Sequence, residues 1–156
     1  MAHTKSSLSA DLLSGLKPRE QDSRPDVILD FIFRDGLFFI SISNIGDKPA
    51  YKVSVKFDCK VYGLAGTKEI SALPLFRNIE FLAPKKEIVT FLDSSSSYFG
   101  REAPTKIAAR ISYRDSDGAK RSVTINHDLE IYREIGYMIR SEDGQPLFDQ
   151  IARPGE

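Results

Sequence analysis

The chain has 156 residues, of which 41% are hydrophobic and 10% aromatic, so it has enough apolar material for a core and is not wholly disordered. Lys and Arg total 22, equal to Asp and Glu, so the composition predicts no global attraction to nucleic acid or to an anionic membrane. The single cysteine excludes an internal disulfide and a cysteine-based metal cage, and the two histidines leave little material for a zinc site.

Residues 1–25 are predicted to be a polar arm. Four leucines in this arm fall on one helical stripe: Leu8, Leu12, Leu13 and Leu16. The arm is either a frayed leader or a short helix that becomes ordered only by docking, in cis or on a partner. It lacks the apolar core of a secretory signal, and no run in the chain is long enough to span a bilayer. We therefore expect a cytoplasmic protein without a membrane span; the alternative is an exported protein from which a leader was removed.

Alternating patterns begin at residue 26 and predict a β-hairpin. Val27–Phe33 and Leu37–Ser43 each place apolar residues at every second position, and Asp35-Gly36 between them is a strong hairpin signal. A two-residue turn there pairs Phe33 with Phe38, which both belong to the apolar phase. Turn chemistry and hydrophobic phase therefore agree.

The segment from Tyr51 to Val61 has the most regular alternation in the chain. Its odd-numbered positions are Tyr, Val, Val, Phe, Cys and Val, and its even-numbered positions are polar or charged. This pattern predicts one half-buried strand whose odd-numbered side chains all point inward.

The later part of residues 26–133 adds further strands. We expect a short strand or crossing segment at Leu73–Ala83, a loop at 93–104, and hairpin strands on either side of the turn at 115–118. The last strand is expected to run from Lys120 to Tyr132, with Ile131 facing inward. About seven strands with short turns and no long helices predict an all-β fold, best satisfied by a two-sheet antiparallel sandwich; a small barrel is the rival. Residues 134–156 are expected to form a C-terminal tail, a flexible or helical arm, with three apolar residues: Leu147, Phe148 and Ile151.

Two segments resemble parts of the bacterial and archaeal immunoglobulin-like domains of the cell-adhesion-related (CARDB-like) kind. One has the form strand, Asn-x-Gly-x-x-Pro-Ala, strand, and the other is similar to the last hairpin of those domains. The matching residues are Asn44, Gly46, Pro49 and Ala50, then Tyr113, Asp115 and Gly118. The resemblance covers residues 27–132. It implies an immunoglobulin-like β-sandwich with a binding or scaffolding role and no catalytic residues. Such domains are often exported or membrane-tethered, whereas this sequence shows no export signal.

Candidate chemical sites are weak in this sequence. Cys59 falls on the inward phase and is predicted to be a structural residue. His127 and Asp128 are neighbours in a strand, so they point to opposite faces and do not form a general-base pair. Residues 115–118 start like a calcium loop but lack the later ligands, and the serines at 94–97 lack a nucleophile elbow. We therefore expect no catalytic, metal-binding or cofactor-binding residues.

Six cations are predicted to share one exposed sheet face. Those on one strand are Lys52, Lys56 and Lys60, and those on or just beyond another are Lys106, Arg110 and Arg114. Such a face either binds an anionic partner, whether an acidic protein, a polyanion or nucleic acid, or is an ordinary solvated surface.

These observations favour a non-enzymatic binding or assembly module. We expect protein–protein interaction or self-association through the sandwich surface and the apolar residues of both terminal arms. The alternative is a polyanion- or nucleic-acid-binding protein that uses the cationic face. A hydrolytic enzyme is the least favoured function, because convergent acid–base groups are scarce.

Overall fold

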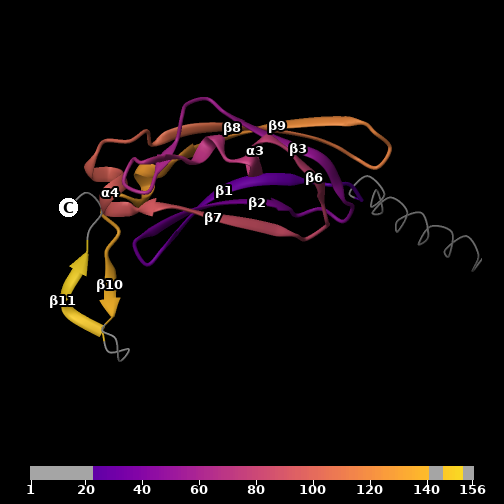
Figure 1. The fold of residues 1–156 in the computed structure, drawn as a ribbon. Coiled ribbons are helices and arrows are strands. Elements are labelled where there is room, and N and C mark those ends of the chain that lie inside the picture. The colour runs from indigo at the N-terminus through magenta and orange to yellow at the C-terminus, as the bar shows by residue number, and fades with distance from the viewer. Residues whose placement is uncertain (1–22, 141–145, 153–156) are drawn as a thin grey trace, which may run out of the picture.

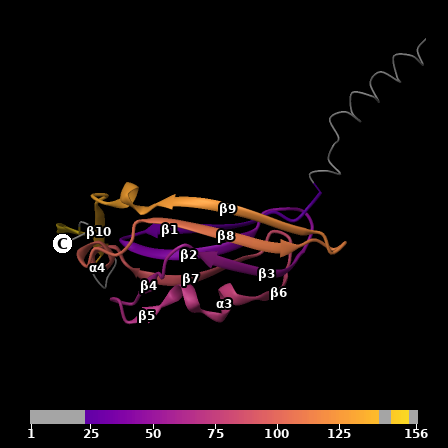
Figure 2. The ribbon, with the colours of Figure 1, turned by 90° about the horizontal axis from the view of Figure 1, so that it is seen from above.

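Two antiparallel sheets face each other and form a β-sandwich (Figures 1 and 2). The structure, a computed structural model, describes residues 23–140 and 146–152. The first sheet has the order β1-β2-β7 and the second the order β6-β3-β8-β9. Their bounds are β1 Val27–Arg34, β2 Leu37–Asn44, β7 Glu87–Ser94, β6 Ile79–Leu82, β3 Ala50–Phe57, β8 Lys106–Arg114 and β9 Lys120–Asp128. These seven strands confirm the predicted all-β, immunoglobulin-like sandwich.

Shorter elements connect the strands and extend one end of the sandwich. They are β4 Tyr62–Gly63, β5 Lys68–Glu69, η1 Ile70–Ala72, α3 Pro74–Arg77, α4 Ser95–Gly100, η2 Leu129–Tyr132, β10 Tyr137–Arg140 and β11 Pro146–Ala152. In the part of the chain that the structure describes, no helix is long and apolar enough to cross a membrane.

The β1–β2 hairpin has the predicted register. Phe33 pairs with Phe38 across it. Asp35 and Gly36 both have positive φ values, 52° and 78°, as a two-residue hairpin turn of type I′ requires. Most inward side chains of both strands, such as Phe31 and Ile40, are at most 2% exposed and belong to the core, and Phe33 at the end of β1 is half-buried against it. The agreement of turn and phase therefore predicted this hairpin correctly.

The prediction of one uniform strand over residues 51–61 was wrong at both ends. Lys52 has a φ of +51°, and the ladder between β3 and β8 is irregular beside it, as at a β-bulge. The extra residue reverses the phase, so Ala50 is fully buried while Tyr51 lies on the outer face. β3 ends at Phe57, so Lys60 lies outside the sheet. An alternating sequence conceals a bulge because the pattern continues on both sides of it.

Two other segments also differ from expectation. The predicted loop at 93–104 contains α4, because the Ser94 hydroxyl accepts a hydrogen bond from the Ser97 amide (3.2 Å) and caps the helix. The last strand ends at Asp128, whose carboxylate accepts a hydrogen bond from the Glu130 amide (3.0 Å) and starts η2. As a result Ile131, expected to face inward, is 67% exposed.

The structure tests the prediction for only one of the two terminal arms. The leucine stripe of residues 1–25 lies outside the described residues. The C-terminal segment, expected to be flexible or helical, instead contains the antiparallel pair β10–β11. The Asp143-Gly144 dipeptide between these strands is a hairpin signal that sequence reasoning passed over. The expected short strand within Leu73–Ala83 is β6, which follows α3.

One buried amide side chain joins the two sheets. Asn44 is fully buried at the end of β2. Its Oδ1 accepts hydrogen bonds from the backbone amides of Asp26 (3.1 Å) and Gly46 (3.0 Å). Its Nδ2 donates to the carbonyls of Lys48 (2.8 Å) and Leu82 (3.2 Å). The side chain therefore fixes the entry to β1, the β2–β3 turn and the end of β6 together.

Replacing Asn44 with Asp keeps the size of the side chain and removes both donors. The carboxylate faces two carbonyl oxygens, so we expect Asn44→Asp to lower the free energy of unfolding by about 2–4 kcal/mol. Urea denaturation measures this loss. Asn126→Asp, at an exposed position on β9, is the control and should change the midpoint little. Equal midpoints for the two variants would show that the Asn44 bonds do not hold the sheets.

Candidate interaction surfaces

An apolar patch lies on the outside of the first sheet, among polar residues that include Asp30, Ser41 and Glu87. One row crosses all three strands, with Ile32 beside Phe39 and Phe39 beside Phe91. The rings of Phe39 and Phe91 meet edge to face with centroids 5.6 Å apart. The full set, called here the apolar face, is Ile28, Ile32, Leu37, Phe39, Val89 and Phe91.

The apolar face departs from the pattern of a sheet with one solvated side. Such a sheet alternates apolar inward residues with polar outward ones, whereas the outer side of β1 carries Ile28 and Ile32 beside Asp30 and Arg34. Leu37 and Phe91 are each 37% exposed and Val89 is 46% exposed. Sequence reasoning missed this surface, although the outward isoleucines of β1 were visible in the sequence.

The predicted cations are partly brought together on the outer face of the second sheet. Lys56 lies directly opposite Arg110 on the neighbouring strand. Lys106 pairs with Asp128 across β8 and β9, at the far end of the ladder. Lys52 forms an ion pair with Glu80 (2.8 Å).

One further cation, Lys120, extends this face beyond the predicted set. Arg114 lies opposite Lys120, a cation that the sequence analysis did not include. A groove of about 430 Å³ contains both of them together with Arg110. An adjoining groove of about 530 Å³ at the end of the sandwich has mixed charge, with Arg24, Lys120, Asp26 and Asp47 among its lining residues.

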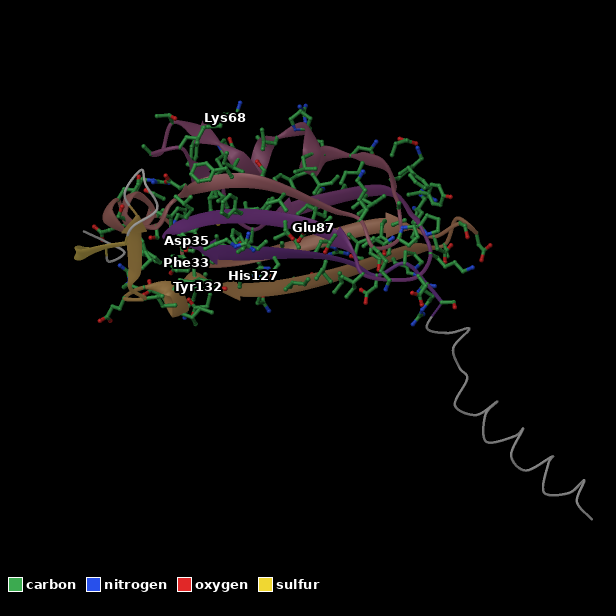
Figure 3. All side chains as sticks on the ribbon, turned by 90° about the horizontal axis from the view of Figure 1, so that it is seen from below. Phe33, Asp35, Lys68, Glu87, His127 and Tyr132 are labelled. Carbon is green, nitrogen blue, oxygen red and sulfur yellow. The ribbon has the colours of Figure 1, made fainter. Side chains whose placement is uncertain are left out.

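An aromatic cluster closes the end of the sandwich at the β1–β2 turn. The rings of Phe33 and Tyr132 are stacked with centroids 5.5 Å apart, and Figure 3 shows both near Asp35. The Tyr137 ring packs on Gly36, where a Cβ atom would lie 2.2 Å from the ring. The start of β10 is thereby attached to the sandwich. The predicted apolar residues Leu147, Phe148 and Ile151 belong to β11, which pairs with β10.

His127 lies on the inner side of β9, as its phase predicted. Its ring meets Phe31 edge-on at 4.9 Å, and its Nε2 is buried without a hydrogen-bond partner. Burial lowers the pKa of His127, against the opposing effects of the Asp30 charge and the Leu29 backbone. Asp128 instead caps η2. No hydrogen bond found among residues 23–140 joins the imidazole to a carboxylate, so the pair is not a catalytic dyad.

The other residues that the sequence offered as candidate sites have structural roles. Burial, and then the neighbouring Asp58, raise the pKa of the Cys59 thiol, which packs beside the core and does not favour the thiolate. The Asp115 carboxylate accepts hydrogen bonds from the amides of Asp117 (2.9 Å) and Ala119 (3.0 Å), as in a hairpin turn. Among the described residues, no three His, Cys, Asp or Glu side chains gather as metal ligands.

An internal ion pair was not anticipated from the sequence. Asp93 is 5% exposed at its side chain and binds the guanidinium of Arg101. Arg101 also donates to the carbonyl of Tyr62 (2.6 Å) and lies over the Tyr98 ring at 5.1 Å. These contacts attach α4 to β4 and β7. The pair stabilises one end of the fold, because the two charges bind each other.

The fold and these surfaces define an immunoglobulin-like β-sandwich whose candidate sites are faces of its sheets. The chain belongs to the family described as a domain of unknown function, DUF8453, whose family model matches residues 5–133. The matched range includes the leucine stripe of the N-terminal arm and ends before β10. A comparison with curated proteins finds no match.

The half-buried imidazole of His127 predicts a pH dependence of stability. Its pKa in the folded state is below the ordinary value of 6.5, so the unfolded chain takes up the proton first. Stability is therefore complete above about pH 6.5 and falls as the pH is lowered toward the folded pKa. Urea midpoints at about pH 7.5 and 5.5 measure this loss.

His127→Phe retains an aromatic partner for Phe31 and removes the titrating group. We expect this variant to lose less stability than the wild type between the two pH values. His3→Gln, in the N-terminal arm, is the matched control and should behave like the wild type. An equal loss in His127→Phe would assign the pH dependence to other groups.

Proposed function

We propose that this protein is a non-enzymatic assembly module, in which the apolar face of one copy binds the leucine stripe of the N-terminal arm of a second copy. The observation that carries the proposal is the uninterrupted row of Ile32, Phe39 and Phe91 across the first sheet. Exposed apolar patches of this kind mark sites of protein–protein contact. A binding role also agrees with what the CARDB-like resemblance implies.

The dimensions of the apolar face support an added helix. Three strands of eight residues form a surface of about 26 Å by 14 Å. Packing two such faces together would bury less than the ~800 Å² per partner of a standard interface, so further apolar residues are needed. A helical stripe from Leu8 to Leu16 is about 12 Å long, which matches the width of the sheet. The family match from residue 5 includes this stripe.

The attachment point of the arm favours a second copy as the source of the stripe. The carbonyls of Arg24 and Asp26 accept hydrogen bonds from Asp47 (3.2 Å) and Ile45 (2.8 Å), at the start of β1. Ile32 lies six residues after Asp26 along β1, which is about 20 Å away. The seven residue steps from Leu16 to Ser23 reach about 23–25 Å when fully extended, so a return to Ile32 on the same molecule would need a nearly straight segment.

A non-enzymatic role is supported by the state of the polar groups in the grooves. The groove of about 310 Å³ beside His127 also contains Asp58 and Asp128. Asp58 accepts a hydrogen bond from the Ala108 amide (3.0 Å), and Asp128 caps η2. Both carboxylates of this groove therefore bond to backbone amides, and neither is hydrogen-bonded to the His127 imidazole as an acid–base pair would require.

The assembly is tested by weakening each partner surface separately. We expect the full chain to associate with increasing concentration in sedimentation velocity. The double variant Phe39→Thr with Phe91→Thr should raise the dissociation constant at least about tenfold, because each buried apolar side chain contributes about 1.5–3 kcal/mol before ordering costs. Leu12→Ser with Leu16→Ser should have a comparable effect. Threonine preserves the β-propensity of both strands.

Ile131→Thr is the matched control, because it removes an exposed apolar side chain from η2, away from the apolar face. Its association should equal that of the wild type. A full chain that stays monomeric throughout the concentration series would overturn the proposal. An effect of the phenylalanine variants without any effect of the leucine variants would reject the arm as the bound segment.

A further inference from the structure

The outer face of the second sheet combines aromatic and basic side chains in one row. The ladder places Phe81 of β6 beside Tyr51 of β3, Tyr51 beside Arg114 of β8, and Arg114 beside Lys120 of β9. The rings of Phe81 and Tyr51 meet edge to face with centroids 5.5 Å apart, and Phe81 is 55% exposed. Half of this row therefore offers π surface and the other half positive charge.

The row exists because of the bulge at Lys52. Without the extra residue, Tyr51 would share the inward phase of Val53 and would lie on the opposite side of the sheet. The positive φ of Lys52 turns Tyr51 outward and leaves Ala50 in the core. Bulges often redirect a side chain at a functional surface. The sequence pattern alone gave no aromatic residue among the cations.

Two directly opposed cation pairs lie on this face. Lys56 faces Arg110, and Arg114 faces Lys120 across the neighbouring ladder. Like charges directly opposite one another destabilise a sheet. Of the nearby acidic groups, Glu80 is paired with Lys52 (2.8 Å) and Asp115 with Arg121 (3.3 Å). An anionic ligand would relieve the repulsion that the described residues leave uncompensated.

Hydroxyl groups separate the two cation pairs. Ser54, Ser112 and Ser122 form the row between them, about 7 Å from the cations on either side along the strands. Arg110 donates from Nε to the Ser122 hydroxyl (3.0 Å), which leaves the hydroxyl proton free to donate. The groove of about 430 Å³ contains Arg110, Ser112, Arg114 and Ser122. Cations beside hydroxyl donors are suited to phosphate oxygens.

We propose that this face binds single-stranded nucleic acid, with phosphates on the cations and serines and a base stacked on Phe81 and Tyr51. Electrostatic grooves with aromatic stacking platforms are the general solution for binding single strands. An acidic protein would satisfy the cations and would leave the aromatic pair without a role. The inference does not rest on the proposed self-association, because this face belongs to the other sheet.

The test uses the full chain and a fluorescent oligothymidylate of about 15 nucleotides, with binding measured by anisotropy over about 50–200 mM salt. The wild type should bind with an affinity that falls as the salt concentration rises. Lys56→Ser with Arg110→Ser should weaken binding. It should also reduce the slope of the logarithm of the binding constant against the logarithm of the salt concentration by about 1.4 in magnitude, as expected for two lost phosphate contacts to a single strand. The same substitutions remove an opposed cation pair, so their urea midpoint should not fall.

Phe81→Thr separates nucleic acid from other polyanions. We expect it to weaken oligothymidylate binding at least about fivefold through lost stacking, and to leave retention on heparin and on polyglutamate unchanged. The matched controls are Tyr62→Thr for the aromatic residue and Lys68→Ser with Arg77→Ser for the cations. All three positions are exposed outside this face and should have no effect.

Two results would overturn the inference. The first is the absence of oligothymidylate binding by the wild type at low salt. The second is a pair of observations: Phe81→Thr binds oligothymidylate as the wild type does, and Lys56→Ser with Arg110→Ser binds polyglutamate more weakly. Together they would identify an acidic protein as the partner of this face.

Discussion

The hydrogen bonds of Asn44 are the interaction on which the arrangement of the two sheets depends. A buried amide has two donors and two acceptor sites, and from the end of β2 in the first sheet it bonds to Leu82 of the second sheet and to three backbone groups of the connecting segments. Gly46 completes the constraint, since a Cβ there would lie 2.1 Å from the Arg24 carbonyl oxygen. The chain before β1 therefore lies directly against the β2–β3 turn.

The sequence predicted the fold where two independent signals agreed and failed where only one was available. At the β1–β2 hairpin, the Asp35-Gly36 turn and the apolar phase gave the same register. Around Lys52 the apolar–polar alternation of the sequence was the sole signal, and this alternation does not reveal whether a bulge is present. At α4 the serines were interpreted by composition as a loop, whereas the Ser94 hydroxyl acts as a helix cap. A cap depends on local geometry that composition does not record.

The candidate surfaces show why net charge is a poor guide for a sandwich. The chain is neutral overall, yet its two outer faces differ in chemistry. One bears an apolar row, and the other bears two opposed cation pairs. The basic face was accessible to sequence reasoning because its lysines alternate along a strand. The aromatic half of this face could not be predicted from the sequence, because the pairing of Tyr51 with Phe81 depends on the bulge.

The two faces lie on opposite sides of one pair of packed layers, so contact at one does not obstruct the other (Figure 1). An assembly that buries the apolar face leaves each basic face on its outside. Several basic faces held together would raise the effective concentration of each binding site along one polymer, so that weak contacts add up. In such an assembly a small surface on a single copy would be sufficient for a useful affinity. The division of apolar and basic chemistry between the two sheets is what makes this combination compatible within 156 residues.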